Sequence, residues 1–424
     1  MIRFYNGRVL SFGAGLSISE GEVWTDGGDI SYVGPERAEL PLFDREIDLG
    51  GDLIMPGFKN AHTHTAMTFL RSLADDLPLD DWLKKQVFPK ERLLAGEDIY
   101  NFTKLGIMEY LSSGVTSVFD MYLDNAACAA AAIDCGYRFV LCSGFSDRYA
   151  EPEQVERDYL NFNSLHELVS FRLGFHAEYS TSLKRLEYIA SLSEKYGEGV
   201  CMHCSETRAE VDSCISRYGL TPPQLMERLG LLRYGGSAFH CVWVNEEDVS
   251  ILARHGVYAV TNPASNLKLA SGIAPLGRMR EGGVRLALGT DGAASNNALD
   301  MFREMYLASA LQKYLCGDAA AMGADVVLTM ACVGGAEAMG LSCCDDLAAG
   351  KKADLIVIDL AIERPNMQPE NNLVNHLVYS GSKENVRLTM VNGRILYENG
   401  EFFIGEKPED IYRRANEFSR RIAL

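Results

Sequence analysis

Residues 53–64 read LIMPGFKNAHTH, an apolar run that ends in two histidines. Successive side chains of a β-strand point to opposite faces, so His62 and His64, two positions apart, would lie on the same face. Seven more short runs rich in apolar and β-branched residues follow along the chain. They span residues 116–121, 139–145, 171–179, 200–206, 238–244, 258–264 and 285–292. The eight runs predict eight β-strands.

Helical stretches separate these eight runs. Regular alternation of strands and helices is typical of parallel βαβ units, and eight such units close into a barrel. We therefore predict an α/β fold, with a (β/α)8 barrel of the TIM type over residues 55–347.

The two ends of the chain have a different pattern. Residues 1–54 alternate short β-like runs with Gly-Gly and Asp-Gly steps, which mark turns, and residues 348–424 repeat this texture. The polar stretch EDIYRRANEFSRRIAL at residues 409–424 predicts a final helix. The pattern predicts one small β-sandwich domain, built from both ends of the chain and closed by a C-terminal helix.

The charge balance limits the class of partner. Among 424 residues, 58 Asp and Glu outnumber 40 Lys and Arg, for a net charge of −18. Binding to nucleic acid or anionic lipid depends on Lys and Arg, so neither is expected, and a small molecule fits better. No window approaches the roughly 18 apolar residues of a membrane helix. The sequence leaves open whether the chain forms a homo-oligomer.

The cysteines and the N-terminus indicate the compartment. Eleven cysteines show no disulfide-type spacing, and MIRFYNGRVL contains no apolar signal core. We expect a cytoplasmic protein with free thiols. The adjacent Cys343 and Cys344 are interpreted as incidental.

The unusual polar residues fall at the ends of the predicted strands, where a barrel places its active site. His203, His240 and Asp291 end three of them, and His62 and His64 end the first. A histidine pair alone is a weak signal, but five such groups at one end of a barrel predict a metal site. Histidines and a carboxylate suit Zn²⁺ with a position left for water. The fourth strand, GFHAEYS, contains no lysine that could bridge two metals, so we predict one divalent metal.

Two further residues could act beside the metal. Glu206 follows His203 by three positions and could shuttle a proton without being a ligand, or could be only a charge at a helix N-terminus. His176 could contact the substrate, or could be a histidine of the core.

Seven segments carry a resemblance to a known family: PGFKNAHTHTAM, LRSLADDLPLDDWL, SVFDMY, HCSE, FHCVWV, NPASNLKLASGIAP and LGTDGAASNN. The chain resembles the amidohydrolase superfamily, and within it the 5-methylthioadenosine/S-adenosylhomocysteine deaminases. The resemblance runs from about residue 8 to about residue 402. It implies a zinc aminohydrolase that converts the adenine ring of a nucleoside to the inosine analogue and ammonia. Candidate substrates are adenosine, 5′-deoxyadenosine, methylthioadenosine and S-adenosylhomocysteine.

The resemblance also assigns roles to single residues. The family's metal ligands match the following residues: His62, His64, His203 and Asp291. Glu206 matches the glutamate that shuttles a proton, His240 matches the histidine that orients the attacking water, and Asp291 would also accept a proton. Glu91 matches a glutamate that binds the ribose hydroxyls. His176 matches a substrate-contacting histidine, and Trp82 lies in the loop that covers the purine.

Two positions depart from the family. Glu178 adds a carboxylate in the fourth strand, and we expect it near the mouth, where it would favour a more polar or cationic substituent. Ser143 stands where relatives that accept the homocysteine tail carry an arginine. S-adenosylhomocysteine is therefore expected to be a poorer substrate than methylthioadenosine, unless Arg148 or Arg157 substitutes.

Other functions share part of this pattern. Deaminases of guanine or cytosine, and hydrolases of chlorotriazines, use the same metal residues, but a free base offers no ribose for Glu91. A non-catalytic barrel protein that serves only in assembly is a more remote alternative, because the complete set of metal residues is present.

Overall fold

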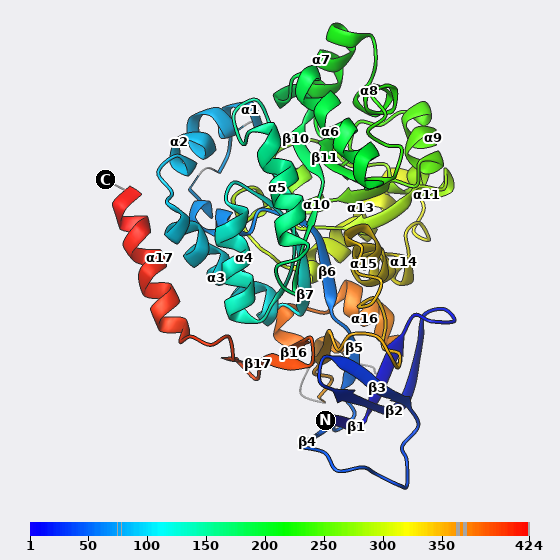
Figure 1. Ribbon diagram of the computed structural model, residues 1–424. Helices are drawn as coiled ribbons and strands as arrows, with labels where there is room; N and C mark the ends of the chain where they lie inside the picture. The colour runs from blue at the N-terminus through cyan, green and yellow to red at the C-terminus, as the bar shows by residue number, and fades with distance from the viewer. Residues whose placement is uncertain (74, 78, 362–364, 368–370, 423–424) are drawn as a thin grey trace.

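A computed structural model describes residues 1–422, except 74, 78, 362–364 and 368–370. An α/β barrel forms the larger part, and a β-sheet domain that contains the N-terminus lies below it (Figure 1). Ala74 and Pro78 of the LRSLADDLPLDDWL segment lie outside the described residues.

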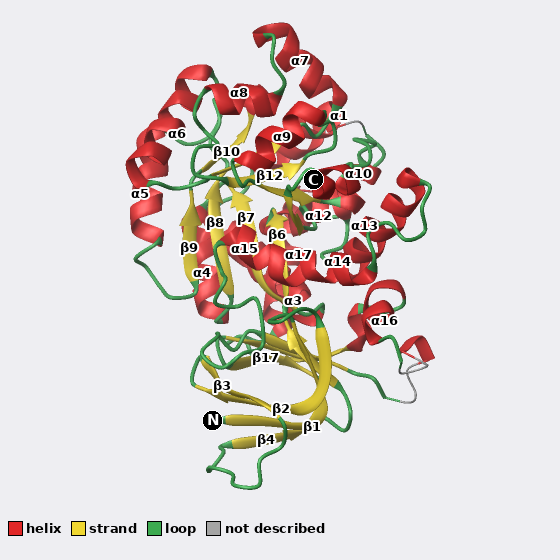
Figure 2. Ribbon diagram, turned by 90° about the vertical axis from the view of Figure 1, so that its right-hand side faces the viewer, coloured by secondary structure: helices red, strands yellow, loops and turns green. Residues whose placement is uncertain are grey.

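The barrel strands form two parallel sheets, which Figure 2 shows at the centre of the molecule. The first sheet has the order β6-β7-β8-β9 and the second the order β10-β11-β12-β13-β14. Their bounds are β6 Phe58–Thr63, β7 Val115–Tyr122, β8 Arg138–Ser143, β9 Val169–Arg172, β10 Gly174–Ala177, β11 Val200–Cys204, β12 Gly236–His240, β13 Tyr258–Thr261 and β14 Arg285–Leu288.

Backbone hydrogen bonds join the two sheets at both seams. The amide of His176, on β10, donates to the carbonyl of Phe145, just after β8, at 2.8 Å. The amide of Asp291, just after β14, donates to the carbonyl of His62 on β6 at 2.9 Å. The strands are therefore arranged around one axis, and the predicted α/β barrel is confirmed.

Two predicted strands are each divided. The run at residues 53–64 is β5 (Leu53–Pro56), which belongs to the other domain, followed by β6 of the barrel. They separate at Gly57, where a Cβ atom would lie 2.1 Å from the side chain of Thr116, so the backbones approach there too closely for a side chain. The run at residues 171–179 likewise divides between β9 and β10, at Leu173.

Other predicted strands extend too far at their C-terminal ends. The runs at residues 200–206 and 285–292 end as strands at Cys204 and Leu288. Beyond these points the backbone leaves the strand, and Ser205 and Asp291 take φ values of 52° and 59°. A continued strand would send alternate side chains outward, whereas these turns hold the polar residues at the barrel mouth.

Helices surround the barrel. They are α1 Leu79–Asp81, α2 Phe88–Glu91, α3 Gly96–Ser112, α4 Asn125–Cys135, α5 Pro152–Phe162, α6 Leu183–Tyr196, α7 Arg208–Tyr218, α8 Pro222–Arg228, α9 Glu246–Arg254, α10 Pro263–Lys268, α11 Leu276–Glu281, α12 Ala293–Asn296, α13 Met301–Cys316, α14 Ala324–Thr329, α15 Gly335–Met339, α16 Leu373–Tyr379 and α17 Pro408–Ile422. A 3-10 helix, η1 (Thr65–Leu70), and a π-helix, η2 (Trp82–Val87), lie near the mouth. No helix within the described part of the chain is long and apolar enough to cross a membrane.

Strands from both ends of the chain join in one nine-stranded sheet of order β18-β17-β16-β15-β5-β1-β2-β3, with β4 beside β1. The remaining bounds are β1 Ile2–Ser11, β2 Ser17–Asp26, β3 Asp29–Gly34, β4 Arg45–Asp48, β15 Leu355–Ile358, β16 Val386–Val391, β17 Arg394–Glu398 and β18 Glu401–Phe402. Its own core includes Phe4, Val23, Leu355 and Met390. Both ends of the chain thus contribute strands to one sheet, and the β-sandwich domain of residues 1–54 and 348–424 stays a prediction.

The predicted C-terminal helix is α17, which runs along α3 on the outside of the barrel (Figure 1). Its Phe418 packs edge-on against Phe69 of η1 and Phe102 of α3, with ring centroids 5.7 and 5.2 Å apart. At its last turn Arg421 pairs with Asp98 at 2.7 Å.

Candidate active site

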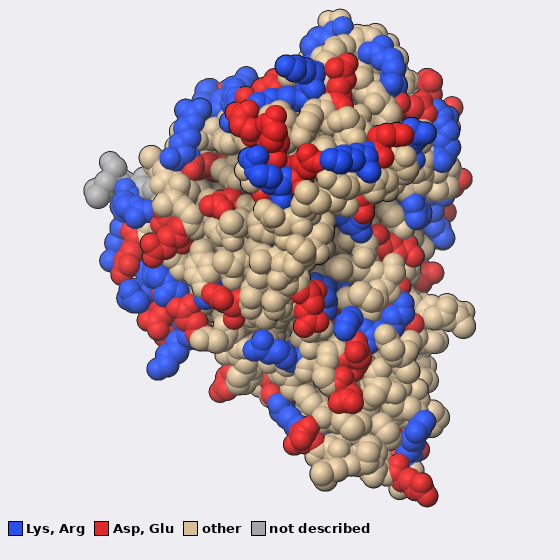
Figure 3. Space-filling model, viewed as in Figure 1, with Lys and Arg blue, Asp and Glu red and all other residues tan. Residues whose placement is uncertain are grey.

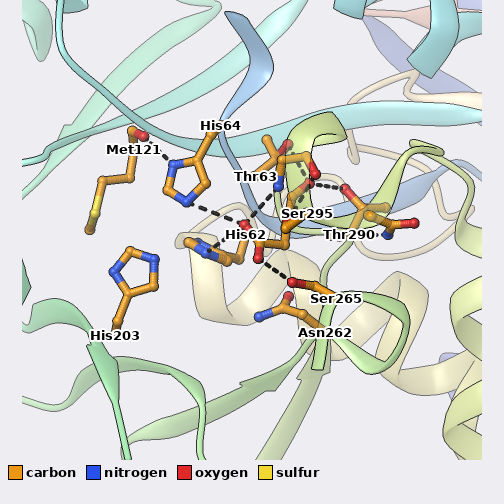
Figure 4. A network of polar contacts seen from close by, with 12 residues as sticks. His62, Thr63, His64, Met121, His203, Asn262, Ser265, Thr290 and Ser295 are labelled. Atoms are coloured by element: carbon orange, nitrogen blue, oxygen red, sulfur yellow. Dashed lines mark hydrogen bonds and ion pairs between the residues drawn. The ribbon is translucent and has the colours of Figure 1, made fainter. Parts of the chain in front are cut away.

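Histidine and carboxylate side chains meet at the C-terminal mouth of the barrel (Figure 4). Ligand atoms of His62, His64 and Asp291 lie within 4.8 Å of one another, and so do those of His62, His203 and His240. The five residues come from β6 and its following turn, β11, β12 and the turn after β14. The structure therefore brings together all five groups that the sequence placed at strand ends.

Hydrogen bonds to the backbone orient two of the imidazoles. Nδ1 of His64 donates to the carbonyl of Met121 at 2.5 Å, and Nδ1 of His203 donates to the carbonyl of His176 at 2.7 Å. When such a ring is neutral and its Nδ1 carries the proton, Nε2 is free to bind a metal. Second partners of this kind are typical of metal-binding histidines, because they fix the tautomer and the ring.

Both ring nitrogens of His62 are buried and have no hydrogen-bond partner among the described residues. Burial, followed by the neighbouring His64, lowers the pKa of His62 well below its usual value, so the ring is neutral. A buried polar atom without a partner costs free energy, and a divalent cation would satisfy it. The donor set of histidines and one carboxylate thus fits Zn²⁺.

Asp291 is the anion of this cluster. Burial acts to raise the pKa of Asp291, but the hydrogen bond and charge of His64 hold it well below its usual range. For His64 the two effects have the opposite signs. Burial lowers its pKa, the hydrogen bond and charge of Asp291 raise it, and the net pKa is about 9. Oδ2 of Asp291 accepts the Ser265 hydroxyl at 2.6 Å, and Oδ1 accepts the Gly292 amide at 2.7 Å.

A pocket opens beside the cluster. Among its lining residues are eight of the nine predicted site residues: His64, Trp82, Glu91, His176, His203, Glu206, His240 and Asp291. The ninth, His62, is fully buried and stacks on Phe239 with ring centroids 3.9 Å apart. Leu79, Val87 and Phe88 add apolar walls, so the pocket suits a flat molecule with a polar edge.

Glu206 and His240 face each other in the pocket. Oε2 of Glu206 lies 3.9 Å from Nε2 of His240, and Oε1 accepts the Ser271 hydroxyl at 3.3 Å. Burial raises the pKa of Glu206, so the carboxyl is easier to protonate than one in water. A carboxyl of this kind can both deliver and accept a proton.

Glu91 and His176 also line the pocket. Burial raises the pKa of Glu91 to about 7, partly offset by the Tyr122 hydroxyl. Burial also lowers the pKa of His176, to about 4, and Nδ1 of His176 is 2.8 Å from the Ser180 hydroxyl. His176 therefore presents a neutral ring to the pocket.

The expectation for Glu178 is wrong. Its side chain is 2% exposed and pairs with Arg217 of α7 at 2.8 Å, and it does not line the pocket. A continued strand would place His176 and Glu178 on the same face, but β10 ends at Ala177 and Glu178 begins the 3-10 helix Glu178–Ser180, where its side chain meets Arg217 instead of the pocket.

Arg148 and Arg157 are the two candidate replacements for the arginine that relatives carry at the position of Ser143. Arg148 is the better placed of the two to meet a substrate. Arg148 lines an outer pocket that shares Phe88, Tyr149 and His176 with the inner one. Its guanidinium lies 5.1 Å from the centre of the Phe88 ring. Arg157, on α5, instead donates to Gln154 and lines neither pocket.

A sequence model of the amidohydrolase family matches residues 53–396. The chain belongs to the amidohydrolase family. The 5-methylthioadenosine/S-adenosylhomocysteine deaminase of Desulforudis audaxviator is 39% identical over 410 residues, which are 95% of each chain. That of Moorella thermoacetica is 40% identical over 397 residues, 92% of each chain.

Solved structures agree with this membership. An adenosine deaminase from Xanthomonas campestris with bound zinc superposes with a TM-score of 0.94 at 30% identity, and the match covers 100% of this chain and 98% of that one. A zinc-bound atrazine chlorohydrolase from Arthrobacter aurescens has a TM-score of 0.90 at 22% identity over 99% of this chain and 100% of that one, a likeness of fold alone. This amidohydrolase thus has the barrel of zinc hydrolases, and its site fits one divalent metal.

Helix α10 of this amidohydrolase contacts two of the site residues. Ser265 and Asn266 lie on α10, in the NPASN segment, and they contact Asp291 and His240. Oδ1 of Asn266 lies 2.8 Å from Nδ1 of His240, a contact that orients the imidazole ring. The sequence marked this segment as characteristic but assigned no role to either residue.

Buried carboxylates that the sequence did not single out hold the loops of the mouth. Glu210, on α7, accepts the amides of Ser205 and Glu206 at 2.9 and 2.8 Å. Glu304, on α13, accepts the amide of Ala264 at 3.0 Å and the side chain of Asn296 at 2.7 Å. The only sequence signal for Glu210 is its position four residues after Glu206, and none exists for Glu304.

Proposed function

We propose that this amidohydrolase deaminates the adenine ring of a nucleoside, releasing the inosine analogue and ammonia. The observation that carries the proposal is the pocket, which is lined both by residues of the metal cluster and by the buried carboxyl of Glu91. A carboxylate can accept two hydroxyl hydrogen bonds, as a ribose 2′,3′-diol offers. The deaminases at 39% and 40% identity, named for methylthioadenosine and S-adenosylhomocysteine, support the same substrate class.

His62, His64, His203 and Asp291 would hold one divalent metal, with zinc supported by the donor set and by the zinc-bound adenosine deaminase. When bound, the metal supplies a Lewis acid that makes water a nucleophile at neutral pH. His240, fixed by Asn266, orients the attacking water toward C6 of the purine.

Proton transfer falls to two carboxylates. Asp291 accepts the proton of the attacking water. It starts as an anion, because the hydrogen bond and charge of His64 keep the pKa of Asp291 low. Glu206 protonates N1 of the ring, so that C6 can become tetrahedral. The protons then pass to the exocyclic amine, which leaves as ammonia. Trp82 and His176 bind the purine from the sides of the pocket.

The 5′ substituent would extend into the outer pocket, where Arg148 lies. Ser143 offers no charge to a carboxylate, and on that basis methylthioadenosine should exceed S-adenosylhomocysteine as a substrate. A role for Arg148 would reduce this difference, and Arg148→Ala would then lower turnover of S-adenosylhomocysteine alone.

The first prediction tests the nucleoside assignment with Glu91→Ala. We expect adenine nucleosides to exceed free adenine, guanine and cytosine in kcat/KM, and the variant to lose about 5- to 150-fold toward nucleosides, from roughly 1 to 3 kcal/mol for buried ribose hydroxyls left without an acceptor. The measurement is ammonia release across these compounds, methylthioadenosine and S-adenosylhomocysteine. Faster turnover of a free base than of every nucleoside would contradict the assignment, as would an unchanged ranking in the variant.

We further propose a cytoplasmic location and a small-molecule substrate rather than a nucleic acid. The support is that the structure contains eleven free cysteines, and that Lys and Arg on the face in Figure 3 are interspersed with Asp and Glu. Sedimentation analysis would test whether the chain forms a homo-oligomer.

A further inference from the structure

Two adjacent cysteines lie in the turn after α15, at the end of the barrel opposite the pocket. The carbonyl of Cys343 accepts the amide of Lys352 at 2.7 Å, close to Asp354, which pairs with Arg138 at the first residue of β8. The pocket lies at the C-terminal strand ends, so this turn is separate from it. The Cys343–Cys344 pair is therefore a feature that the proposed deamination does not use.

The two sulfurs differ sharply in access. Sγ of Cys343 and Sγ of Cys344 are 3.6 Å apart, yet Cys343 is exposed and Cys344 is 1% exposed. A second pair of neighbouring thiols, Cys204 and Cys241, is buried in the barrel wall at 2% and 0% exposure. Only the first pair offers one thiol to solvent with the other held directly behind it.

The surroundings favour the ionised form of the outer thiol. The hydrogen bond from Cys344 and the charge of Arg138 lower the pKa of Cys343, burial and the charge of Asp354 oppose them, and the net pKa is about 6. The thiolate is the nucleophilic form of cysteine. Low pKa, exposure and an adjacent second thiol are the properties of oxidation-sensitive cysteines.

We propose that Cys343 and Cys344 form an oxidation-sensitive dithiol, in which a hydroperoxide oxidises Cys343 and Cys344 resolves the product. The Cys343 sulfur attacks one peroxide oxygen, the O–O bond breaks, and the other oxygen leaves as hydroxide or alkoxide. The Cys344 sulfur then attacks the sulfenic acid, the S–O bond breaks, an S–S bond forms and water leaves. Two electrons pass from the dithiol to the peroxide.

This modification is reversible. Neighbouring Cα atoms are about 3.8 Å apart, less than the roughly 4.4–6.8 Å of ordinary disulfides. A bond between them is strained, and strained disulfides are the readily reduced ones. A low-molecular-weight thiol restores both cysteines.

The experiment treats the full-length enzyme with hydrogen peroxide at low excess and maps its cysteines by mass spectrometry. In the parent, the peptide that carries both residues loses two hydrogen atoms, and dithiothreitol restores it. In Cys344→Ser, a dimedone adduct accumulates on Cys343, because nothing resolves the sulfenic acid. Cys316→Ser, which removes another exposed cysteine, behaves as the parent.

Several results would overturn the proposal. One is a parent peptide that keeps both hydrogens while Cys316 is oxidised at the same or a faster rate. Another is equal dimedone labelling of Cys343 in the parent and in Cys344→Ser. If Cys344→Ser fails to fold, the parent peptide alone decides the outcome, because the intrapeptide loss of two hydrogens is measured there.

Discussion

At the scale of single residues, the site contains carboxyl groups that are alike in the sequence but have pKa values shifted in opposite directions. Asp291 is held as an anion by His64, whereas burial raises the pKa of Glu206 and that of Glu91. Pairs of groups whose surroundings move their pKa values apart are typical of acid and base roles in one site.

The second prediction is that Glu206→Gln keeps its metal and loses activity by about 10²- to 10⁴-fold, because an amide cannot relay a proton. Metal analysis and kcat on methylthioadenosine measure both parts. Glu178→Gln is the matched control: it changes a buried glutamate that faces Arg217 outside the pocket, so kcat should stay close to the parent value. A Glu206→Gln variant within about tenfold of the parent would exclude the shuttle role.

At the scale of elements, the segment α1-η2-α2 forms one wall of the pocket. Trp82, Val87 and Glu91 all line the pocket, and η2 is a π-helix, a form often found at functional sites. The wider turn of a π-helix changes which side chains share a face.

The third prediction concerns Trp82→Ala, which removes the aromatic ring of this wall. Stacking of a base on an aromatic side chain contributes about 1–3 kcal/mol, so we expect KM for the nucleoside to rise roughly 5- to 150-fold with a smaller change in kcat. Lys85→Ala changes an exposed residue of the same π-helix and should leave both constants unchanged. A fall in kcat without a rise in KM would count against a purine-binding role.

Helix α13 contributes to the mouth through Glu304, a buried carboxyl that contacts α10 and α12. Burial raises the pKa of Glu304 to about 8. A carboxyl whose pKa is higher in the folded state stabilises the fold most below its unfolded pKa of about 4.3, and this contribution is lost as pH rises toward 8.

The fourth prediction follows for Glu304→Gln. The amide does not titrate and loses one accepted hydrogen bond, so the variant should be less stable by about 1 kcal/mol at pH 5. Its deficit should shrink or reverse by pH 8.5, because only the parent loses stability over this range. Urea unfolding at both pH values measures the difference, and parallel pH curves for the two proteins would contradict the prediction.

The elements also show what the sequence could predict. Periodicity located every barrel strand, because buried parallel strands are continuous apolar runs. It could not show that residues 53–64 change sheets at Gly57, since both strands are equally apolar. It placed Glu206 and Asp291 on strands, but tertiary contacts such as the Glu210 bonds to Ser205 and Glu206 hold the backbone in turns. Alternation along β10 would have placed His176 and Glu178 on one face, and the sequence could not show that the strand ends at Ala177 and that Glu178 turns to Arg217.

At the scale of the whole molecule, a buried ion pair links the barrel to the nine-stranded sheet. Arg138, at the start of β8, pairs with Asp354, just before β15, at 2.6 Å, and both side chains are nearly inaccessible. Removing one partner of such a pair leaves an unpaired buried charge. The pair therefore anchors the barrel to the nine-stranded sheet.

The barrel itself consists of two sheets, and the metal residues come from both. His62 and His64 belong to the four-stranded sheet and its following turn, whereas His203 and Asp291 belong to the five-stranded sheet and its following turn. At this seam the Asp291 amide bonds the His62 carbonyl. A metal held by these four residues would cross-link the two sheets at the mouth.

The last prediction is that removing the metal loosens this seam. Binding stabilises the fold by about 4 kcal/mol when free metal exceeds its dissociation constant about 1000-fold, so chelation should lower Tm and abolish activity. Hydrogen exchange should quicken at the amides of His62 and Asp291, while amides of β2 in the other domain serve as the control. One equivalent of Zn²⁺ per chain should restore Tm, exchange and activity together. Two metals per active chain, or faster exchange in β2 than at the seam, would contradict a single metal that joins the two sheets.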